Sequence, residues 1–216
     1  MLWHVERGRT SARGLSENGA ERACSPDPTA ASRESQEITV PDVVDDYRRA
    51  TDAFGRRVAL ITGEQWGGST PCTEWSVRDL VAHVLYEQLW IPPLVNGYTI
   101  FDVGDRLDGD QLGGDALGAW RRAQADVVKT IAIDGALERI VNLSSGARSA
   151  ADYLAEVTVD TLIHTWDLAR AIGDDERLDD RLVRETLVAK CAEDEADFRL
   201  GGDDQSTLLS LFGRTP

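Results

Sequence analysis

Segments with the apolar repeat of an amphipathic helix constrain this fold more than any other feature of the chain. Residues 42–61 carry apolar side chains at spacings of three and four, and residues 150–172 carry a second apolar stripe. We expect two further helices at 77–96 and 115–133, and no internal repeat is visible. Four long helices joined by moderate connections predict a four-helix bundle.

Local signals set the expected boundaries of these helices. Ser76 is a good N-cap for the second helix, and Gly173 is a good stop for the fourth. Pro92 and Pro93 should kink the second helix or end its regular part near Trp90. Residues 140–143 predict a short strand or extended segment, and a fifth helix is expected at 179–200, followed by a short apolar tail at 208–212. The predicted fold is therefore all-α: a four-helix bundle with a short extended segment and an additional C-terminal helix.

The chain is long enough for one domain and a tail. Its 216 residues exceed the 150–180 or so that such a domain needs. Residues 1–36 are rich in Arg, Ser, Gly, Ala and Glu and lack apolar periodicity. We therefore expect a disordered N-terminal tail over 1–36 and one helical domain over 37–216.

Charge and cysteine content exclude several classes of partner. A net charge of −15 disfavours nucleic acid and anionic membranes, because both bind clustered lysine and arginine. No apolar run is long enough to span a membrane, and no secretory h-region is visible. Cys24, Cys72 and Cys191 form an odd, scattered set without a CxxC pair. That set argues against a disulfide framework and indicates a cytoplasmic protein.

Two of the three histidines stand where a metal site would need them. His83 lies in the second predicted helix, whereas His164 lies in the fourth, one helical turn after Asp160 and on the same face. Two imidazoles and one carboxylate make a three-ligand site with an open position, the pattern of a catalytic metal. The alternatives are a core histidine at 83 and a helix-stabilising acid–imidazole pair at 160 and 164. His4 lies in the predicted tail and is set aside.

Glu87 follows His83 by one helical turn and faces the same way. It could be a fourth ligand, an acceptor for an imidazole N–H, or a general base. The alternative is a solvated residue at the rim of the bundle. Trp90, one turn further on, is a candidate for the wall of the site's mouth.

Four other residues near these motifs have simpler structural interpretations. Asp167 and Arg170 are three residues apart and predict a local ion pair, which contributes little if exposed. Trp166 is expected in the core. Cys72 precedes the second helix with no base beside it in sequence, so we expect a packed loop residue and not a nucleophile.

The motifs together resemble the mycothiol-dependent maleylpyruvate isomerase type of metal-binding protein, within the wider group of DinB-like four-helix bundles. The resemblance covers about residues 40–216. It rests on residues 70–83 (TPCTEWSVRDLVAH), 87–90 (EQLW), 160–171 (DTLIHTWDLARA) and the closing 208–216 (LLSLFGRTP). It implies His83 and His164 as metal ligands, with Asp160 where the isomerase has a glutamate. The resemblance also implies zinc as the metal and an actinobacterial source.

The resemblance implies a metal site more strongly than it implies maleylpyruvate isomerisation, because we expect this chain to lack the C-terminal domain of the true isomerase. The leading hypothesis is a zinc-dependent thiol transferase or isomerase, with mycothiol as cosubstrate, an electrophilic small-molecule substrate and Glu87 as proton carrier. We expect it to act as a monomer or homodimer, without nucleic acid or membrane. The alternatives are metal-assisted hydrolysis, a facial-triad iron site, and a metal-binding stress-response module without turnover.

Overall fold

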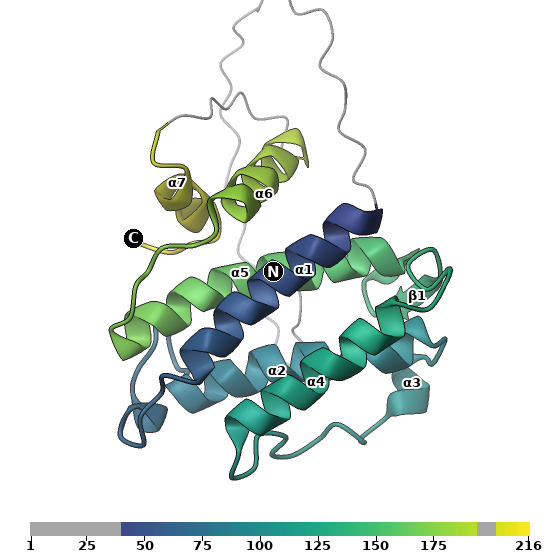
Figure 1. The fold of residues 1–216 in the computed structure, drawn as a ribbon, viewed down its shortest axis with the longest axis horizontal. Helices are drawn as coiled ribbons and strands as arrows, with labels where there is room; N and C mark the ends of the chain where they lie inside the picture. The colour runs from purple at the N-terminus through teal and green to yellow at the C-terminus, as the bar shows by residue number, and fades with distance from the viewer. Residues whose placement is uncertain (1–39, 194–201) are drawn as a thin grey trace, which may run out of the picture. The chain divides into compact units, whose positions relative to one another are not determined.

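The computed structural model describes residues 40–193 and 202–216. The expected tail at 1–36 lies outside the described residues. The described part is mainly helical and carries one small hairpin (Figure 1). Its elements are α1 (Val40–Val58), one turn of 3₁₀ helix (Gln65–Gly67), α2 (Val77–Val95), α3 (Ile100–Val103), α4 (Ala116–Ile131), β1 (Ile140–Leu143), β2 (Gly146–Ser149), α5 (Ala150–Ile172), α6 (Asp180–Glu193) and α7 (Asp204–Leu211).

The four long helices pack as a closed ring. Helix α1 contacts α5, α5 contacts α2, α2 contacts α4, and α4 contacts α1 again. Helices that follow each other in sequence, α1 and α2 or α4 and α5, therefore lie on opposite sides of the ring. The predicted all-α four-helix bundle is confirmed, and the helices that carry His83 and His164 are neighbours.

Helices α1 and α4 approach closely at a glycine. Gly55 lies in the interior of α1, and a Cβ atom built there would come within 2.6 Å of the Trp120 indole nitrogen on α4. Phe54 stacks on the same indole, with ring centroids 4.8 Å apart. Both aromatic side chains are buried, so they form the centre of the core between α1, α2 and α4.

Helix α5 is buried on opposite faces. Leu168 belongs to the core shared with α1, α2 and α4. Leu162, Ile163 and Trp166 pack instead against residues of α6, α7 and the segment before α6, including Leu182 and Leu208. A helix enclosed in this way holds its polar side chains in fixed positions, and this helix carries Asp160 and His164.

Several details differ from the sequence expectations. Helix α2 has the expected overall bounds, but its regular part does not end near Trp90 and continues through Pro92 and Pro93 to Val95. The buried side chains of Ile91 and Leu94 hold that last turn against the core, which offsets the missing backbone donors. The extended segment at Ile140–Leu143 is β1, and it pairs antiparallel with the unpredicted β2. The apolar tail at 208–212 largely belongs to helix α7.

Short polar motifs fix where two of the minor elements begin. The four-residue helix α3 starts at a capping box formed by Thr99 and Asp102. Helix α7 starts at Asp203, whose side chain accepts from the Ser206 backbone N–H. Within the described residues, no helix has both the length and the apolar character that a membrane span requires.

Candidate metal centre

Helix caps set the position of both candidate histidines. The Ser76 hydroxyl accepts from the Asp79 backbone N–H, and the Asp79 carboxylate accepts from the Ser76 backbone N–H. This capping box fixes the start of α2 and places His83 in its second turn. The Ser149 hydroxyl likewise caps α5, which then runs without interruption through Asp160 and His164 to Gly173.

The three predicted ligands converge between α2 and α5. His83 Nε2 lies 3.6 Å from Asp160 Oδ2, and His164 Nε2 lies 3.5 Å from Asp160 Oδ1. One ligand atom from each residue lies within 4.8 Å of the other two. A tetrahedral zinc ion with bonds of about 2.0–2.1 Å separates its ligand atoms by roughly 3.3 Å. The observed nitrogen–oxygen separations are long for hydrogen bonds but close to that spacing.

The Asp160 carboxylate supplies an independent test of whether a cation fits. Its Oδ2 atom is buried and has no hydrogen-bond partner in the described part of the chain. Burial raises the pKa of Asp160, but His83, His164 and Arg214 outweigh it and hold the pKa below the ordinary value. The carboxylate is therefore ionised, and leaving one of its buried oxygens without a hydrogen bond is costly. Two imidazole nitrogens and this oxygen form a donor set that suits zinc.

His164 is oriented by a carboxylate on its far side. Its Nδ1 lies 2.9 Å from Oδ2 of Asp167, which is completely buried. An Nδ1–H that donates to a carboxylate leaves Nε2 as the nitrogen directed at Asp160, an arrangement common around protein-bound metals. Burial lowers the pKa of His164, but Asp167, Cys72 and Asp160 raise it to about 10. Metal binding at Nε2 would therefore release a proton.

The predicted Asp167–Arg170 ion pair is wrong. Asp167 binds Arg214 instead, with Nη2 2.7 Å from Oδ2 and Nε 3.2 Å from Oδ1. Arg170 lies over the Trp166 ring and pairs with Glu176. The physical reason is burial: Asp167 points into the protein, whereas the Arg170 side chain is partly exposed.

Cys72 is a partly buried loop residue, but bases lie beside it in the fold. Its Sγ is 3.2 Å from Asp167 Oδ2 and 3.8 Å from His164 Nδ1. These three residues form a second group whose spacing could hold a metal. Arg214 Nη2 lies 3.5 Å from that sulfur and 2.7 Å from Asp167, so a guanidinium cation already contacts two members of this group. The group around Asp160 is therefore the better cation site.

Glu87 lies deep in the bundle and not at a solvated rim. The residue is 2% exposed, and its Oε2 has no hydrogen-bond partner among the described residues. Burial, with a further contribution from the Asp160 charge, raises the pKa of Glu87 to about 8. At neutral pH the carboxyl group mostly keeps its proton, so it can donate one or exchange one near physiological pH.

A cleft of about 590 Å³ opens at His83. Trp75 forms part of its wall and contacts both histidines, with ring centroids 4.7 Å from His83 and 5.8 Å from His164. Trp90 is buried beside Tyr86 and does not line this cleft, so it does not form the mouth as its position in sequence suggested. The other residues that line the cleft include three acidic side chains and none that is basic: Glu74, Asp79, Ala82, Tyr86, Leu107, Asp108 and Gly109.

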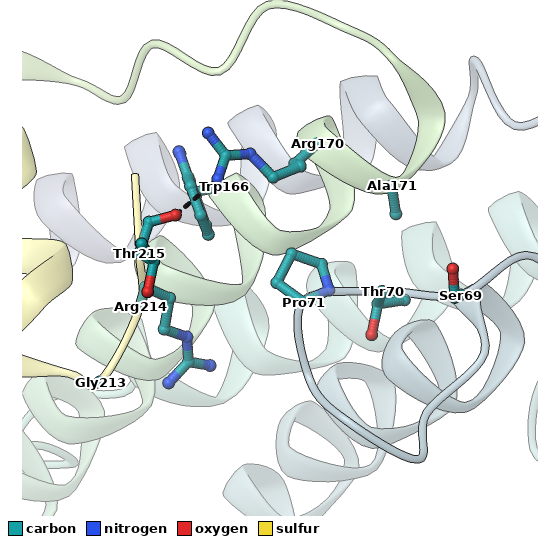
Figure 2. A pocket seen from close by; sticks show the side chains of 9 residues that line it. All are labelled: Ser69, Thr70, Pro71, Trp166, Arg170, Ala171, Gly213, Arg214 and Thr215. Carbon is teal, nitrogen blue, oxygen red and sulfur yellow. Dashed lines mark hydrogen bonds between the residues drawn. The ribbon is translucent and has the colours of Figure 1, made fainter.

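A second cleft, of about 530 Å³, is lined by residues of the loop at 69–71, of α5 and of the C-terminal segment (Figure 2). Arg170 and Arg214 both line it, but their guanidinium groups point in different directions. Arg170 donates to the Thr215 carbonyl at 2.7 Å. Both guanidinium groups are held by protein partners, so this cleft offers no free cationic group for a ligand.

Comparison with known proteins identifies the family. Residues 47–169 match the family described as the mycothiol maleylpyruvate isomerase N-terminal domain. Two uncharacterized proteins of Mycobacterium tuberculosis, from strains CDC 1551 and H37Rv, are each 32% identical over 157 residues, which cover 71% of this chain and 80% of theirs. The chain belongs to the mycothiol maleylpyruvate isomerase N-terminal domain family, as the sequence motifs suggested.

Solved structures agree on the fold. A crystal structure of a mycothiol-dependent maleylpyruvate isomerase superposes with a TM-score of 0.55 at 18% identity, and that of a mutant of the enzyme with 0.57 at 19%. Each comparison covers 74% of this chain and 73% of the other. At such low identity the likeness supports the fold alone.

Sequence reasoning missed Asp167, Arg214 and Trp75 as members of this region. Asp167 lies three residues after His164 and three residues before Arg170, so helical spacing allowed a pair with either residue. The predicted partner was Arg170, whereas in the structure Asp167 contacts His164. Trp75 lies within the quoted motif and contacts both histidines. Nothing in sequence connects Arg214 to α5, because the contact depends on how the last residues fold back.

Proposed function

We propose that this protein is a zinc-dependent thiol transferase or isomerase that uses a small thiol such as mycothiol. The observation that carries the proposal is a buried Asp160 oxygen that lacks a hydrogen-bond partner, in a carboxylate that lies between two imidazoles on neighbouring helices. In this proposal His83, Asp160 and His164 hold the metal and leave one position open. The family, whose description names a mycothiol enzyme, supports the choice of a thiol as the ligand for that position.

A bound zinc ion would supply Lewis acidity, which lowers the pKa of a coordinated thiol. The chain's own residues would do the rest. Asp167 keeps a proton on His164 Nδ1 and so keeps Nε2 directed at the site. Trp75 covers one side of the imidazoles and limits the access of water to them.

Glu87 is the proposed proton carrier. It lies one turn after His83, is buried, and has a pKa raised to about 8. A carboxyl group that titrates close to neutral pH can take a proton from an incoming thiol or return one to a product. Holding a metal and moving a proton are then assigned to different residues.

The acidic mouth of the cleft argues against maleylpyruvate itself as the substrate. Glu74, Asp79 and Asp108 line the cleft at His83 without a lysine or arginine among its lining residues. Maleylpyruvate is a dicarboxylate, and carboxylates of like charge repel it. We therefore propose an uncharged or cationic electrophile, and we place the reaction in the cytoplasm, where thiols stay reduced.

Metal-dependent thermal stability tests the ligand set. Zn²⁺ that binds only the folded state should raise the melting temperature of the wild-type chain by mass action. His83→Ala, Asp160→Ala and His164→Ala should each abolish that shift. Cys72→Ala is the matched control and should keep it. A shift that survives in all three ligand variants would place the metal elsewhere.

The thiol is tested with Co²⁺ in place of zinc, because its visible bands report its ligands. Added mycothiol should produce a thiolate-to-metal charge-transfer band that strengthens from about pH 6 to pH 8, since binding releases the thiol proton. Glu87→Gln should keep the metal and lower turnover by as much as 10²–10⁴-fold, the range of general acid–base catalysis. If millimolar thiol leaves the cobalt spectrum unchanged, hydrolysis or simple metal binding becomes the better account.

A further inference from the structure

The last residues of the chain return to the far side of the candidate metal centre. After α7 ends at Leu211, the segment turns at Phe212 and Gly213 and brings Arg214 against α5. The Arg214 guanidinium also donates from Nη1 to the Phe212 carbonyl at 2.7 Å. This bond holds the guanidinium to its own turn, so the group approaches Asp167 in a defined orientation.

Arg214 holds both oxygens of the Asp167 carboxylate. Nε donates to Oδ1 at 3.2 Å, and Nη2 donates to Oδ2 at 2.7 Å. In the part of the chain that the structure describes, Arg214 is the side chain that satisfies Oδ1, whereas Oδ2 also receives His164 Nδ1 and the Cys72 thiol. Two-point contacts of this kind fix the plane of a carboxylate, which a point charge cannot do.

We propose that Arg214 is a positioning residue for the metal site: by fixing Asp167 it keeps the His164 ring turned so that Nε2 faces Asp160 and His83. The proposal rests on the metal site proposed above. Without Arg214, the buried Oδ1 atom loses its partner, and the carboxylate can rotate or take up a proton. Either change weakens the constraint on His164 Nδ1 and therefore on the direction of Nε2.

The alternative is that Arg214 only anchors the C-terminal segment. Arg170 separates the two possibilities, because its guanidinium anchors the same segment through the Thr215 carbonyl but pairs with Glu176, whereas Asp167 is paired with Arg214. Its guanidinium lies over Trp166 and pairs with Glu176 (Figure 2). Arg170→Met therefore removes an anchor of the segment and leaves the Asp167–His164 contact in place.

The first measurement is the affinity for Co²⁺, by competition with a chelator, in the full-length wild type, Arg214→Met and Arg170→Met. Arg214→Met should lower the affinity by about 10–100-fold, the usual effect of losing a group that orients a ligand. The cobalt d–d bands of Arg214→Met should also shift. The cobalt affinity of Arg170→Met should stay within about twofold of the wild-type affinity, and its spectrum should be unchanged. An unchanged affinity in Arg214→Met, or an equal loss in Arg170→Met, would overturn the proposal.

The second measurement needs no metal, so it separates this proposal from the proposed function. In the NMR spectrum of the metal-free wild type and Arg170→Met, the His164 Nδ1–H proton should exchange slowly and resonate far downfield. It should exchange rapidly in Arg214→Met, and its persistence there would refute the positioning role even if no metal binds. If Arg214→Met does not fold, Arg214→Lys replaces it in both measurements. The loss of cobalt affinity and the faster exchange of the His164 proton should then be smaller but in the same direction, because lysine keeps the charge but loses the two-point contact.

Discussion

Asp160 carries a carboxylate where an apolar stripe would otherwise continue. One of its oxygens is buried without a hydrogen-bond partner, while two imidazole nitrogens lie 3.5 and 3.6 Å away. The two neighbouring histidines offset part of the cost of burying this charge in the metal-free chain. A divalent cation would offset more of it, because it would contact the oxygen and both nitrogens at once.

Glu87 provides a test at the scale of a single residue. Its pKa rises from 4.5 to about 8 on folding because the carboxyl group is buried. Between those values the unfolded chain has lost the proton and the folded chain keeps it, so the metal-free wild type loses stability as the pH rises through this range. Glu87→Gln cannot ionise. The free energy of unfolding of Glu87→Gln relative to the wild type should therefore grow by about 3–4 kcal/mol from pH 5 to pH 8.

Urea unfolding of the metal-free proteins at both pH values measures this difference. Glu64→Gln, at an exposed position, is the control and should follow the wild type at each pH. A difference between Glu87→Gln and the wild type that does not change with pH would show that Glu87 is ionised in the folded protein.

Residue spacing predicted the three candidate ligands but not their surroundings. His83, Asp160 and His164 could be found because helical periodicity places two of them on one face and the third in another apolar helix. The raised pKa of Glu87 depends on burial of its carboxyl group. The contact of Arg214 with Asp167 depends on how the C-terminal segment folds back onto α5. Neither leaves a local pattern in the sequence.

At the scale of elements, α2 and α5 form the frame of the site. Helix α5 has the bounds that its apolar stripe and Gly173 predicted, and β1 coincides with the expected extended segment. Helix α2 was harder to predict at its end, because proline signals a break locally while burial of Ile91 and Leu94 favours continuation. The tertiary contacts decided the outcome.

Gly55 tests the packing of α1 on α4. In an exposed helix interior, glycine to alanine stabilises by roughly 0.5–1 kcal/mol. Here the new Cβ would lie 2.6 Å from Trp120 Nε1, so Gly55→Ala should instead destabilise, by about 1–3 kcal/mol. Gly63→Ala is the control, because nothing lies within 4 Å of a Cβ there. Thermal or urea unfolding measures whether the substitution raises or lowers stability. A Gly55→Ala variant more stable than the wild type would contradict the close approach of α1 and α4.

At the scale of the whole molecule, the bundle ring brings segments together that are far apart in sequence. Helices α2 and α5 are neighbours although α3, α4 and the hairpin lie between them along the chain. Periodicity predicted that four helices would pack as a bundle, but the order around the ring is not encoded in any one helix. The contact of the C-terminal segment with α5 likewise joins residues that are far apart in sequence, and no single helix encodes it.

The N-terminal residues provide a test at this scale. We expect residues 1–36, which lie outside the described residues, to add little to folding, because their sequence lacks apolar periodicity and the described bundle has its own core. A chain that starts near residue 38 should unfold cooperatively, within about 0.5 kcal/mol of the full-length protein, and should bind metal equally well. Loss of cooperative unfolding in the truncated chain would show that the N-terminal residues contribute to the fold.

X-ray absorption at the zinc edge tests the central claim most directly. We expect the zinc-loaded protein to show only nitrogen and oxygen ligands, at about 2.0–2.1 Å, from His83, Asp160, His164 and solvent. After addition of mycothiol, one sulfur should appear at about 2.3 Å. A sulfur ligand before any thiol is added would assign the metal to a cysteine of the chain, in contradiction to the proposed ligand set. An unchanged spectrum after the addition would contradict a thiol-binding metal site.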